Sequence, residues 1–277
     1  MHMHSTVSDG TDTPFQLIEK VKACNIEVFS VTDHDSVKSA QIIKTALSEK
    51  DPVFIAGVEF SCKDENGKYH ILGYGYDPKS RDIQSMVDYS HSLRMKKVTA
   101  RLEYLKSEFG FCFTPQDIQK LLSLDNPGKP HIGNLMVKYG FADSKESAIK
   151  NYINTIRIKG EYLRPQDAIS GIIASGGIPV LAHPFYGSGD ELILGKDMTD
   201  RIEQLVKYGL GGIEAFYSGF TDKLRNEAMC LAEEFDLVIT AGSDYHGKNK
   251  LVSLGDTGLF AKTEYPKRLQ LFLSNFM

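Results

Sequence analysis

The stretch from Ile26 to Phe60 decides the fold of this chain. It contains the apolar run IEVFSV at Ile26–Val31 and a second apolar run, VFIAGVEF, at Val53–Phe60, with an amphipathic segment at Ser36–Ser48 between them. Short apolar runs are typical of buried strands, whereas apolar residues three or four apart are typical of a helix. The stretch is therefore predicted to be a β-α-β unit.

The same alternation continues on both sides of this unit. A helix is expected at Phe15–Ala23, where Pro14 suits the first turn. Strands separated by helices are typical of a parallel sheet with the helices outside it, so the chain is predicted to have an α/β fold. A further apolar run, KYHILGYGY, lies at Lys68–Tyr76. The later strands and helices are expected, in order, at Gly177–Ala182, Asp200–Tyr208, Gly212–Phe216, Thr221–Glu234 and Leu237–Ala241.

The pattern changes between residues 82 and 169. No apolar run of comparable strength occurs there, and the segments are charged and have helical spacing. We predict a helical insertion domain at 82–169 that contributes to substrate binding, between the two parts of an α/β domain at 1–81 and 170–277. Its helices are expected at Ser92–Phe109, Thr114–Leu124, Ile132–Tyr139 and Ser144–Ile153.

The composition narrows the classes of protein. The chain has 277 residues, with 32 Lys and Arg against 36 Asp and Glu, so its formal charge of −4 argues against bulk binding of nucleic acid. Its four cysteines form no Cys-x-x-Cys motif, and no stretch resembles a signal peptide or a membrane span. A cytoplasmic protein with no membrane contact and no obligatory protein partner is expected.

The histidines are distributed in a way that indicates metal binding. His2 and His4 can point two imidazoles to one side of an extended chain, although a lone histidine is more often a satisfied polar residue. Reactive groups of parallel α/β barrels lie where strands end. Six of the eight histidines, together with three carboxylates, fall at expected strand ends or near them: His2, His4, Asp33, His34, Glu59, His70, His183, Asp244 and His246.

These donors favour particular metals and a particular reaction. Imidazole nitrogen and carboxylate oxygen without thiolate suit Zn, Mn or Fe. The number of candidate ligands exceeds what one ion can use, so several ions are expected. Clusters of this kind activate water and clamp the oxygens of a phosphoryl group. Hydrolysis of a phosphate ester is the expected chemistry.

The motifs as a set resemble the PHP (polymerase and histidinol phosphatase) family of metal-dependent phosphoesterases. The similarity is greatest to its stand-alone bacterial branch with a helical insertion, which includes nucleoside 3′,5′-bisphosphate phosphatases and an RNA 5′-3′ exonuclease. The motifs are His2-x-His4, Ser8-Asp9-Gly10, Thr32-Asp33-His34-Asp35, Gly57-Val58-Glu59, Lys129-Pro130-His131-Ile132-Gly133, Ala182-His183-Pro184, Gly212-Ile213-Glu214-Ala215 and Ser243-Asp244-Tyr245-His246-Gly247.

The resemblance implies a distorted (β/α)7 TIM-like barrel that holds three divalent transition-metal ions and uses a metal-bridging hydroxide as nucleophile. It implies that His2, His4, Glu59 and Asp244 hold the first ion. Glu59 would bridge to a second ion, completed by His70 and His183, and Asp9, His34 and His246 would hold the third. From the residues alone, Ser8-Asp9-Gly10 is equally typical of a turn.

The chain departs from the family at two places. The family's first strand usually starts several residues before His-x-His, so either this strand is short or residues precede Met1. Lys129 stands where an arginine is usual. Lysine keeps the positive charge, but it cannot bind a phosphate through two parallel N–H groups as arginine does.

Other polar residues are assigned secondary roles. Arg94, Lys129 and His131 are expected to contact a substrate phosphate, with a solvated helix face as the alternative. Asp33 and Asp35 are expected to support neighbouring groups and not to bind metal themselves.

The predicted function is hydrolysis of phosphomonoesters of nucleotide-like substrates, with 3′,5′-bisphosphates favoured. Histidinol-phosphate phosphatase activity and 5′-3′ exonuclease activity on short RNA are the alternatives from the same site. A non-catalytic metal-binding module is disfavoured because the set of ligands is complete.

Overall fold

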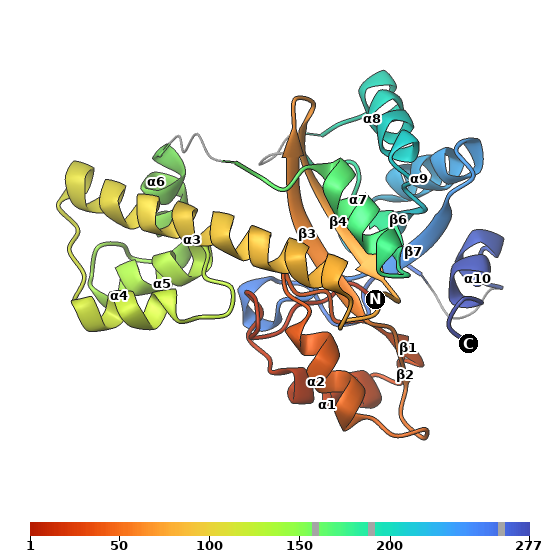
Figure 1. Ribbon diagram of the computed structural model, residues 1–277, viewed down its shortest axis with the longest axis horizontal. Coiled ribbons are helices and arrows are strands. Elements are labelled where there is room, and N and C mark those ends of the chain that lie inside the picture. Colours follow the sequence, from red (N-terminus) through yellow and green to blue (C-terminus); the bar gives the residue numbers. More distant parts are fainter. Residues whose placement is uncertain (157–160, 188–191, 260–263) are drawn as a thin grey trace.

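The computed structural model describes residues 1–156, 161–187, 192–259 and 264–277. Over these ranges the chain is an α/β structure in which helices surround a five-stranded sheet (Figure 1). The strands pair in sequence order and are β3 (Gly57–Asp64), β4 (Gly67–Tyr74), β5 (Ile178–Leu181), β6 (Gly212–Tyr217) and β7 (Val238–Gly242).

The sheet is mixed, so the prediction of a wholly parallel sheet is wrong. β5, β6 and β7 are parallel, but β3 and β4 form an antiparallel hairpin and β4 is antiparallel to β5. At the hairpin turn Gly67 has φ +134°, and Asn66 N–H donates to Asp64 Oδ1 over 2.8 Å. Asp at the first position and Gly at the fourth, as in Asp64 and Gly67, favour such tight turns, and a tight turn leaves no room for the crossover helix that parallel strands need.

The second apolar run that predicted one strand at Val53–Phe60 is divided. β2 (Val53–Phe54) pairs in parallel with β1 (Val28–Phe29), and β3 starts anew at Gly57. A Cβ at Gly57 would lie 2.0 Å from Ser30 Oγ, so the two backbones approach closely where the chain leaves one sheet for the other. Glu59 is therefore the third residue of β3 and not the end of a strand.

The N-terminal segment joins the two sheets. Met3 forms a parallel bridge with Tyr245, just beyond β7, and Met3 O accepts from Thr32 N over 2.8 Å, just beyond β1. A bridge between His34 and Glu59 connects the segment after β1 to β3. These pairings bring His2, His4 and the segments after β1 and β7 together at one end of the sheets.

Most of the flanking helices match their expected positions. α7 had not been expected, and it lies against β3, β4 and β5, where its residues Ala168, Ile169 and Ile172 join the main core. α1 and α2 pack with β1 in a second, smaller core. The helices are α1 (Pro14–Ala23), α2 (Lys38–Ala46), α7 (Pro165–Ala174), α8 (Lys196–Lys207), α9 (Asp222–Glu234) and α10 (Lys267–Leu273).

The central part of the chain is helical. α3 (Arg81–Phe109) begins eleven residues earlier than expected, with Ser80 Oγ accepting from Asp82 N. It is followed by α4 (Pro115–Leu122), α5 (Lys129–Lys138), α6 (Lys145–Asn151) and the short 3-10 helix η1 (Ile153–Thr155).

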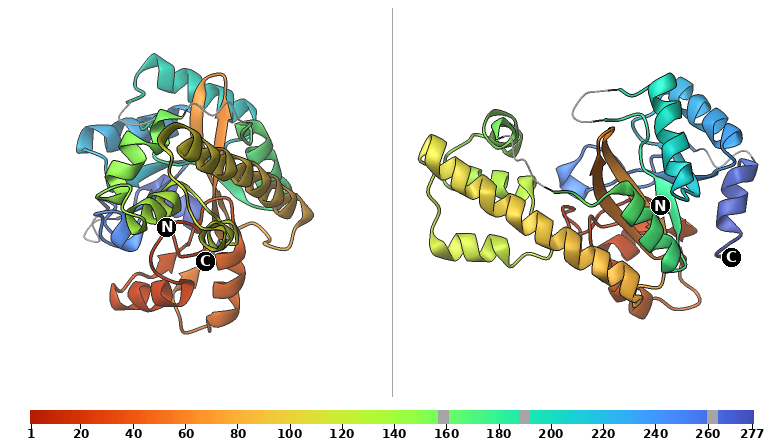
Figure 2. Two further views of the ribbon diagram at one scale, coloured as in Figure 1. Left: turned by 90° about the vertical axis from the view of Figure 1, so that its left-hand side faces the viewer. Right: turned by 45° about the horizontal axis from the view of Figure 1, so that its top comes forward.

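α3 belongs to two cores. Its first half contributes Ile83 and Met86 to the main core, and its second half contributes Val98 and Leu105 to a separate core with α4–α6. In Figure 2 the helix runs from the sheet out to these three helices. None of the helices in the described ranges is both long and apolar enough to cross a membrane.

Candidate metal centre

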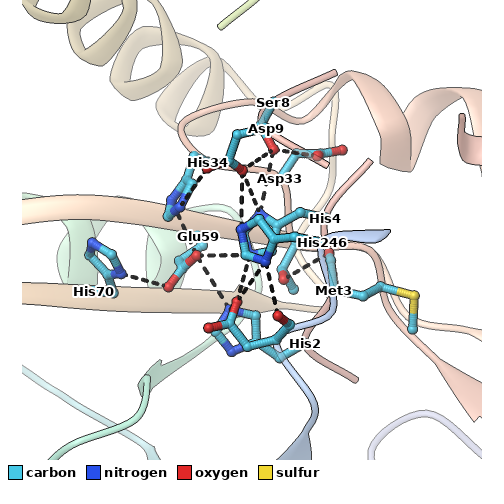
Figure 3. A network of polar contacts seen from close by, with 12 residues as sticks. His2, Met3, His4, Ser8, Asp9, Asp33, His34, Glu59, His70 and His246 are labelled. Carbon is cyan, nitrogen blue, oxygen red and sulfur yellow. Dashed lines mark hydrogen bonds and ion pairs between the residues drawn. The ribbon is translucent and has the colours of Figure 1, made fainter. Parts of the chain in front are cut away.

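The imidazoles of His2 and His4 lie side by side and are fully buried. His2 Nε2 is 3.3 Å and His4 Nε2 is 3.1 Å from Glu59 Oε2, and the same two nitrogens are 3.4 and 3.3 Å from Asp244 Oδ1 (Figure 3). The alternation of an extended chain accounts for the shared direction of the two rings. Two imidazoles and two carboxylates thus converge on one point.

Glu59 lies at the centre of the cluster. Its Oε1 is 2.8 Å from His70 Nδ1 and 3.3 Å from His183 Nε2, whereas its Oε2 is 3.1 Å from His34 Nδ1. Burial alone would raise the pKa of this carboxyl, but the imidazoles around it hold the pKa well below its usual range. Glu59 is thus placed to serve two groups of imidazoles at once.

A third, outer group contains Asp9, His34 and His246. His246 Nε2 is 3.2 Å from Asp9 Oδ1, and His34 Nε2 is 4.0 Å from Asp9 Oδ2. Burial would raise the pKa of Asp9, but the neighbouring imidazoles of His34 and His246 lower it below its usual range. Asp9 therefore faces the cluster, although its sequence motif is equally typical of a turn.

The fit of these residues to metal ions can be tested on their unpaired atoms. Among the described residues, His2 Nε2, His4 Nε2, His34 Nδ1 and Glu59 Oε2 are buried without a hydrogen-bond partner, although they face one another. Such orphaned polar atoms are costly unless something binds them. Three sets have donor atoms within 4.8 Å of one another: His4, Asp9, His34 and His246; His2, His4 and Asp244; and His34, Glu59 and His70. The donors suit divalent transition metals.

From the sequence Glu214 was named only as part of a family motif and was given no role, yet it supports two of these histidines. It is fully buried in β6; Oε1 accepts from His2 Nδ1 over 3.0 Å, and Oε2 accepts from the His183 backbone N–H over 2.8 Å. His183 has φ +27°, so this bond stabilises a strained backbone. A Cβ at Gly242 would lie 2.2 Å from Glu214 Oε1, which explains the glycine there. A carboxylate inside the apolar strand GIEAFY is the signal that could have revealed it.

The aspartates after β1 support their neighbours, as expected. Asp33 is fully buried and accepts from Ser5 N over 2.7 Å and from Ser8 Oγ over 2.6 Å, which ties the loop after His4 to the strand. Asp35 accepts from Ser61 N over 3.1 Å and pairs with Arg94.

Asp244 has further partners on the side away from the histidines. Its Oδ2 accepts from Tyr217 O–H over 3.0 Å and from Lys250 Nζ. Lys250 had not been identified from the sequence. Tyr217 is buried and held by this bond.

A cavity of about 360 Å³ opens beside Asp9, His34 and His70, beneath α3 and the start of α5. Four cations line it: Arg94, Lys97, Arg101 and Lys129. Arg94 pairs with Asp35, but none of the other three has a carboxylate within 4.0 Å in the described part of the chain. Lys129 Nζ instead donates to Asn154 Oδ1 over 2.5 Å, and Lys97 Nζ lies 3.1 Å from the centre of the Tyr162 ring.

The two lysines of this cavity have lowered pKa values. Burial, with the nearby charges of Arg94 and Arg101, lowers the pKa of Lys97 to about 8. Burial, with Arg101 and Lys68, lowers the pKa of Lys129 to about 8. Uncompensated cations in a partly buried cavity favour an anionic ligand.

The residues predicted to contact substrate do not all line this cavity. Arg94 and Lys129 do, and so do Lys97 and Arg101. His131 is not among the lining residues; its Nδ1 accepts from Gly128 N over 3.1 Å and caps α5. A contact between His131 and substrate stays a prediction.

Fold and site together define a class of protein: an α/β structure with clustered histidines and carboxylates beside a cationic cavity. The PHP domain model matches residues 1–167. The chain therefore belongs to the PHP domain family and is a metal-dependent phosphoesterase, which confirms the resemblance seen in its motifs.

Several characterised or solved proteins are similar to it. A 5′-3′ exoribonuclease of Haemophilus influenzae is 28% identical over 92% of each chain. A phosphoribosyl 1,2-cyclic phosphate 1,2-diphosphodiesterase of Eggerthella lenta is 30% identical over 90% of this chain and 94% of its own. A 3′,5′-nucleoside bisphosphate phosphatase of Chromobacterium violaceum is 26% identical over 89% and 86%. A crystal structure from Bifidobacterium adolescentis, described as a metal-dependent phosphoesterase, superposes with a TM-score of 0.83 at 25% identity, covering 100% of this chain and 95% of that one.

Proposed function

We propose that this phosphoesterase hydrolyses phosphomonoesters of nucleotide-like substrates that carry a second phosphate, with nucleoside 3′,5′-bisphosphates favoured. The observation that carries the proposal is the cationic cavity beside the histidine and carboxylate cluster, in which Lys97, Arg101 and Lys129 have no carboxylate partner among the residues that the structure describes. A phosphate remote from the reacting one would supply the missing negative charge.

The proposed centre holds three divalent ions, which are Mn, Zn or Fe. His2, His4, Glu59 and Asp244 would hold the first, and Glu59, His70 and His183 the second. Asp9, His34 and His246 would hold the third. The convergence of their donor atoms supports this assignment. When bound, such ions activate the attacking water and neutralise charge on the phosphoryl oxygens.

The chain's own residues would orient the reaction. Glu214 holds the ring of His2 and the backbone of His183, so their ligand nitrogens are fixed before substrate arrives. The cations of the cavity would bind the remote phosphate, and its binding energy would help to orient the reacting group.

The proposed fold is the distorted (β/α)7 barrel, with an insertion inside the predicted range 82–169. The N-terminal segment supports closure of the barrel, because it hydrogen-bonds both to the segment after β7 and to the segment after β1. The separate core of α4–α6 with the second half of α3 supports an insertion. α7, which packs in the main core, starts before residue 170, so the second part of the barrel would begin at Pro165.

The cavity also discriminates between the alternatives. Histidinol phosphate carries a cation at its far end, which the unpaired charges of Lys97, Arg101 and Lys129 would repel. A short RNA supplies additional phosphates and suits the same cations, and a similar relative is named an exoribonuclease. Exonuclease action on oligoribonucleotides is therefore the second candidate.

Steady-state assays of the metal-loaded protein test the proposal. A nucleoside 3′,5′-bisphosphate is expected to show a higher kcat/KM than histidinol phosphate, and a higher one than a 5′-phosphorylated oligoribonucleotide. Lys129→Met should lower kcat/KM for the bisphosphate by about tenfold or more, since a hydrogen bond to a charged group contributes about 1.5–3 kcal/mol. An aryl phosphate, which has no second phosphate, should be little affected.

Lys138→Met is a matched control. Lys138 lies on the same helix, pairs with Asp117 at 2.7 Å and does not line the cavity. Hydrolysis of histidinol phosphate with a higher kcat/KM than the bisphosphate would contradict the proposed substrate class. If Lys129→Met lowered kcat/KM equally for the bisphosphate and for the aryl phosphate, Lys129 would lie at the reacting group.

A further inference from the structure

The helical insertion contacts the outer group of ligands, Asp9, His34 and His246, through side chains that the metal centre itself does not use. The first contact comes from the loop between α4 and α5. Asn126, whose side chain is almost fully buried, donates from Nδ2 to the backbone oxygen of His34. The segment that carries His34 is thereby bonded to the insertion.

A second contact reaches the same group from α6. Lys145 Nζ donates to Asn249 Oδ1 over 3.0 Å, and Asn249 Nδ2 donates to the backbone oxygen of Asp9 over 2.7 Å. Asn249 also donates its backbone N–H to His246 O over 3.3 Å. One asparagine therefore connects two of the three outer ligands to α6.

The geometry of this connection is specific. Both polar atoms of the Asn249 amide are used, one as donor and one as acceptor, so neither Asp nor Ala at this position could make both bonds. The stem of Lys145 is held against α5, since a Cβ at Gly133 would lie 3.2 Å from Lys145 Cγ. The side chain of Lys145 is only 17% exposed.

The inner ligands are supported differently. Glu214, which holds His2 and His183, lies in β6 and makes its bonds within the sheet region. Loss of the contacts from α4–α6 would leave those bonds in place. A change in the insertion should therefore affect the outer group of ligands selectively.

We propose that Asn126, Lys145 and Asn249 are positioning residues that make the helical insertion part of the outer metal site. Docking of the insertion on the segments that carry Asp9, His34 and His246 and occupancy of that site are then coupled, and by linkage each stabilises the other. Binding of the outer ion would prepare the cationic cavity for substrate. The inference rests on the three-ion centre proposed above.

Metal content is the first test. Full-length protein loaded with Mn²⁺ and passed through a desalting column is expected to hold three ions per chain. Asn249→Ala should retain two, with affinity for the third lowered by about 10- to 100-fold. Lys145→Met should also lower the affinity for the third ion. Lys145→Arg, which keeps a hydrogen-bond donor, should retain that affinity. Lys138→Met is the matched control and should hold three.

Hydrogen exchange gives a readout that a merely structural defect would not produce. In the wild type, Mn²⁺ should slow exchange of the amides of α5 and α6. In Asn249→Ala this slowing should disappear, while the slowing in β4, which carries His70, should persist. A purely structural defect would instead speed exchange in the helices equally with and without metal.

The possible outcomes are distinguishable. If Asn249→Ala binds three ions with wild-type affinity, or if Mn²⁺ still slows exchange in its α5 and α6, the inference is overturned. Wild-type protein that binds no ions would overturn the proposed metal centre, and this inference with it. Three ions in the wild type and two in Asn249→Ala would support both.

Discussion

Replacing Glu214 by glutamine changes one buried atom and removes one charge. In the native chain the two carboxylate oxygens accept from two N–H groups, His2 Nδ1–H over 3.0 Å and the His183 backbone N–H over 2.8 Å. A glutamine has only one acceptor oxygen, so its NH₂ group must face one of these donors. The residue is fully buried, so water cannot replace the lost bond.

The expected loss can be worked out in two ways. A hydrogen bond to a charged group contributes about 1.5–3 kcal/mol, and one of two such bonds is lost. Removal of a carboxylate that orients a metal-binding histidine typically weakens metal binding by about 10- to 100-fold, which corresponds to about 1.4–2.8 kcal/mol. The two figures agree. Glu214→Gln should therefore raise the dissociation constant of the most weakly retained inner ion by about 10- to 100-fold.

Competition with a metallochromic chelator measures this constant directly, and circular dichroism checks that the apoprotein is folded. Glu203→Gln is the matched control, because Glu203 lies on the exposed surface of α8, and its ion pair within the described ranges is with Lys207 at 3.0 Å. Unchanged metal affinity in a folded Glu214→Gln protein would refute the argument that this carboxylate orients the histidines.

Two further predictions concern the centre and the cavity. Glu59→Gln should lose at least one of three ions and most of the turnover, because a neutral amide cannot balance the charge of two ions. Elemental analysis that shows wild-type metal content would contradict the bridging role of Glu59. The pKa values of Lys97 and Lys129 are lowered to about 8, so both are charged below pH 8 and neutral above it. We therefore expect kcat/KM for a bisphosphate to fall as the pH rises through about 8. The double Lys97→Arg, Lys129→Arg variant, which stays charged, should remove that fall, and an unchanged profile would mean that these lysines do not hold the phosphate.

The chemistry of the site could be predicted from the sequence because it depends on local features. Residue type alone defines imidazole and carboxylate donors, and the alternation of an extended chain places His2 and His4 on one side. The parallel strands β5–β7 and helices α1, α2, α8 and α9 followed from apolar spacing, which is a property of ten or so neighbouring residues. The family followed from motifs of the same local kind.

Other features depend on partners that are remote in the sequence. Glu214 gains its role only where β6 lies beside the N-terminal segment, 212 residues away. The sequence alone could not predict that Lys97, Arg101 and Lys129 lack a carboxylate partner within the described part of the chain, because this depends on which side chains the fold brings close to α3 and α5. Asn249 connects Asp9 to α6 through contacts that span 240 and 104 residues.

The sequence by itself therefore indicated which atoms can bind metal and where most of the strands and helices lie. Only the tertiary structure decided that β3 and β4 form a hairpin, that Glu59 lies between two groups of imidazoles, and that Asn126 and Lys145 are connected to the segments carrying His34 and Asp9. The physical reason is that propensity and periodicity act over a few residues. Hydrogen-bond satisfaction and the pKa of a buried group depend on whichever distant side chains the closed fold brings within about 3–4 Å.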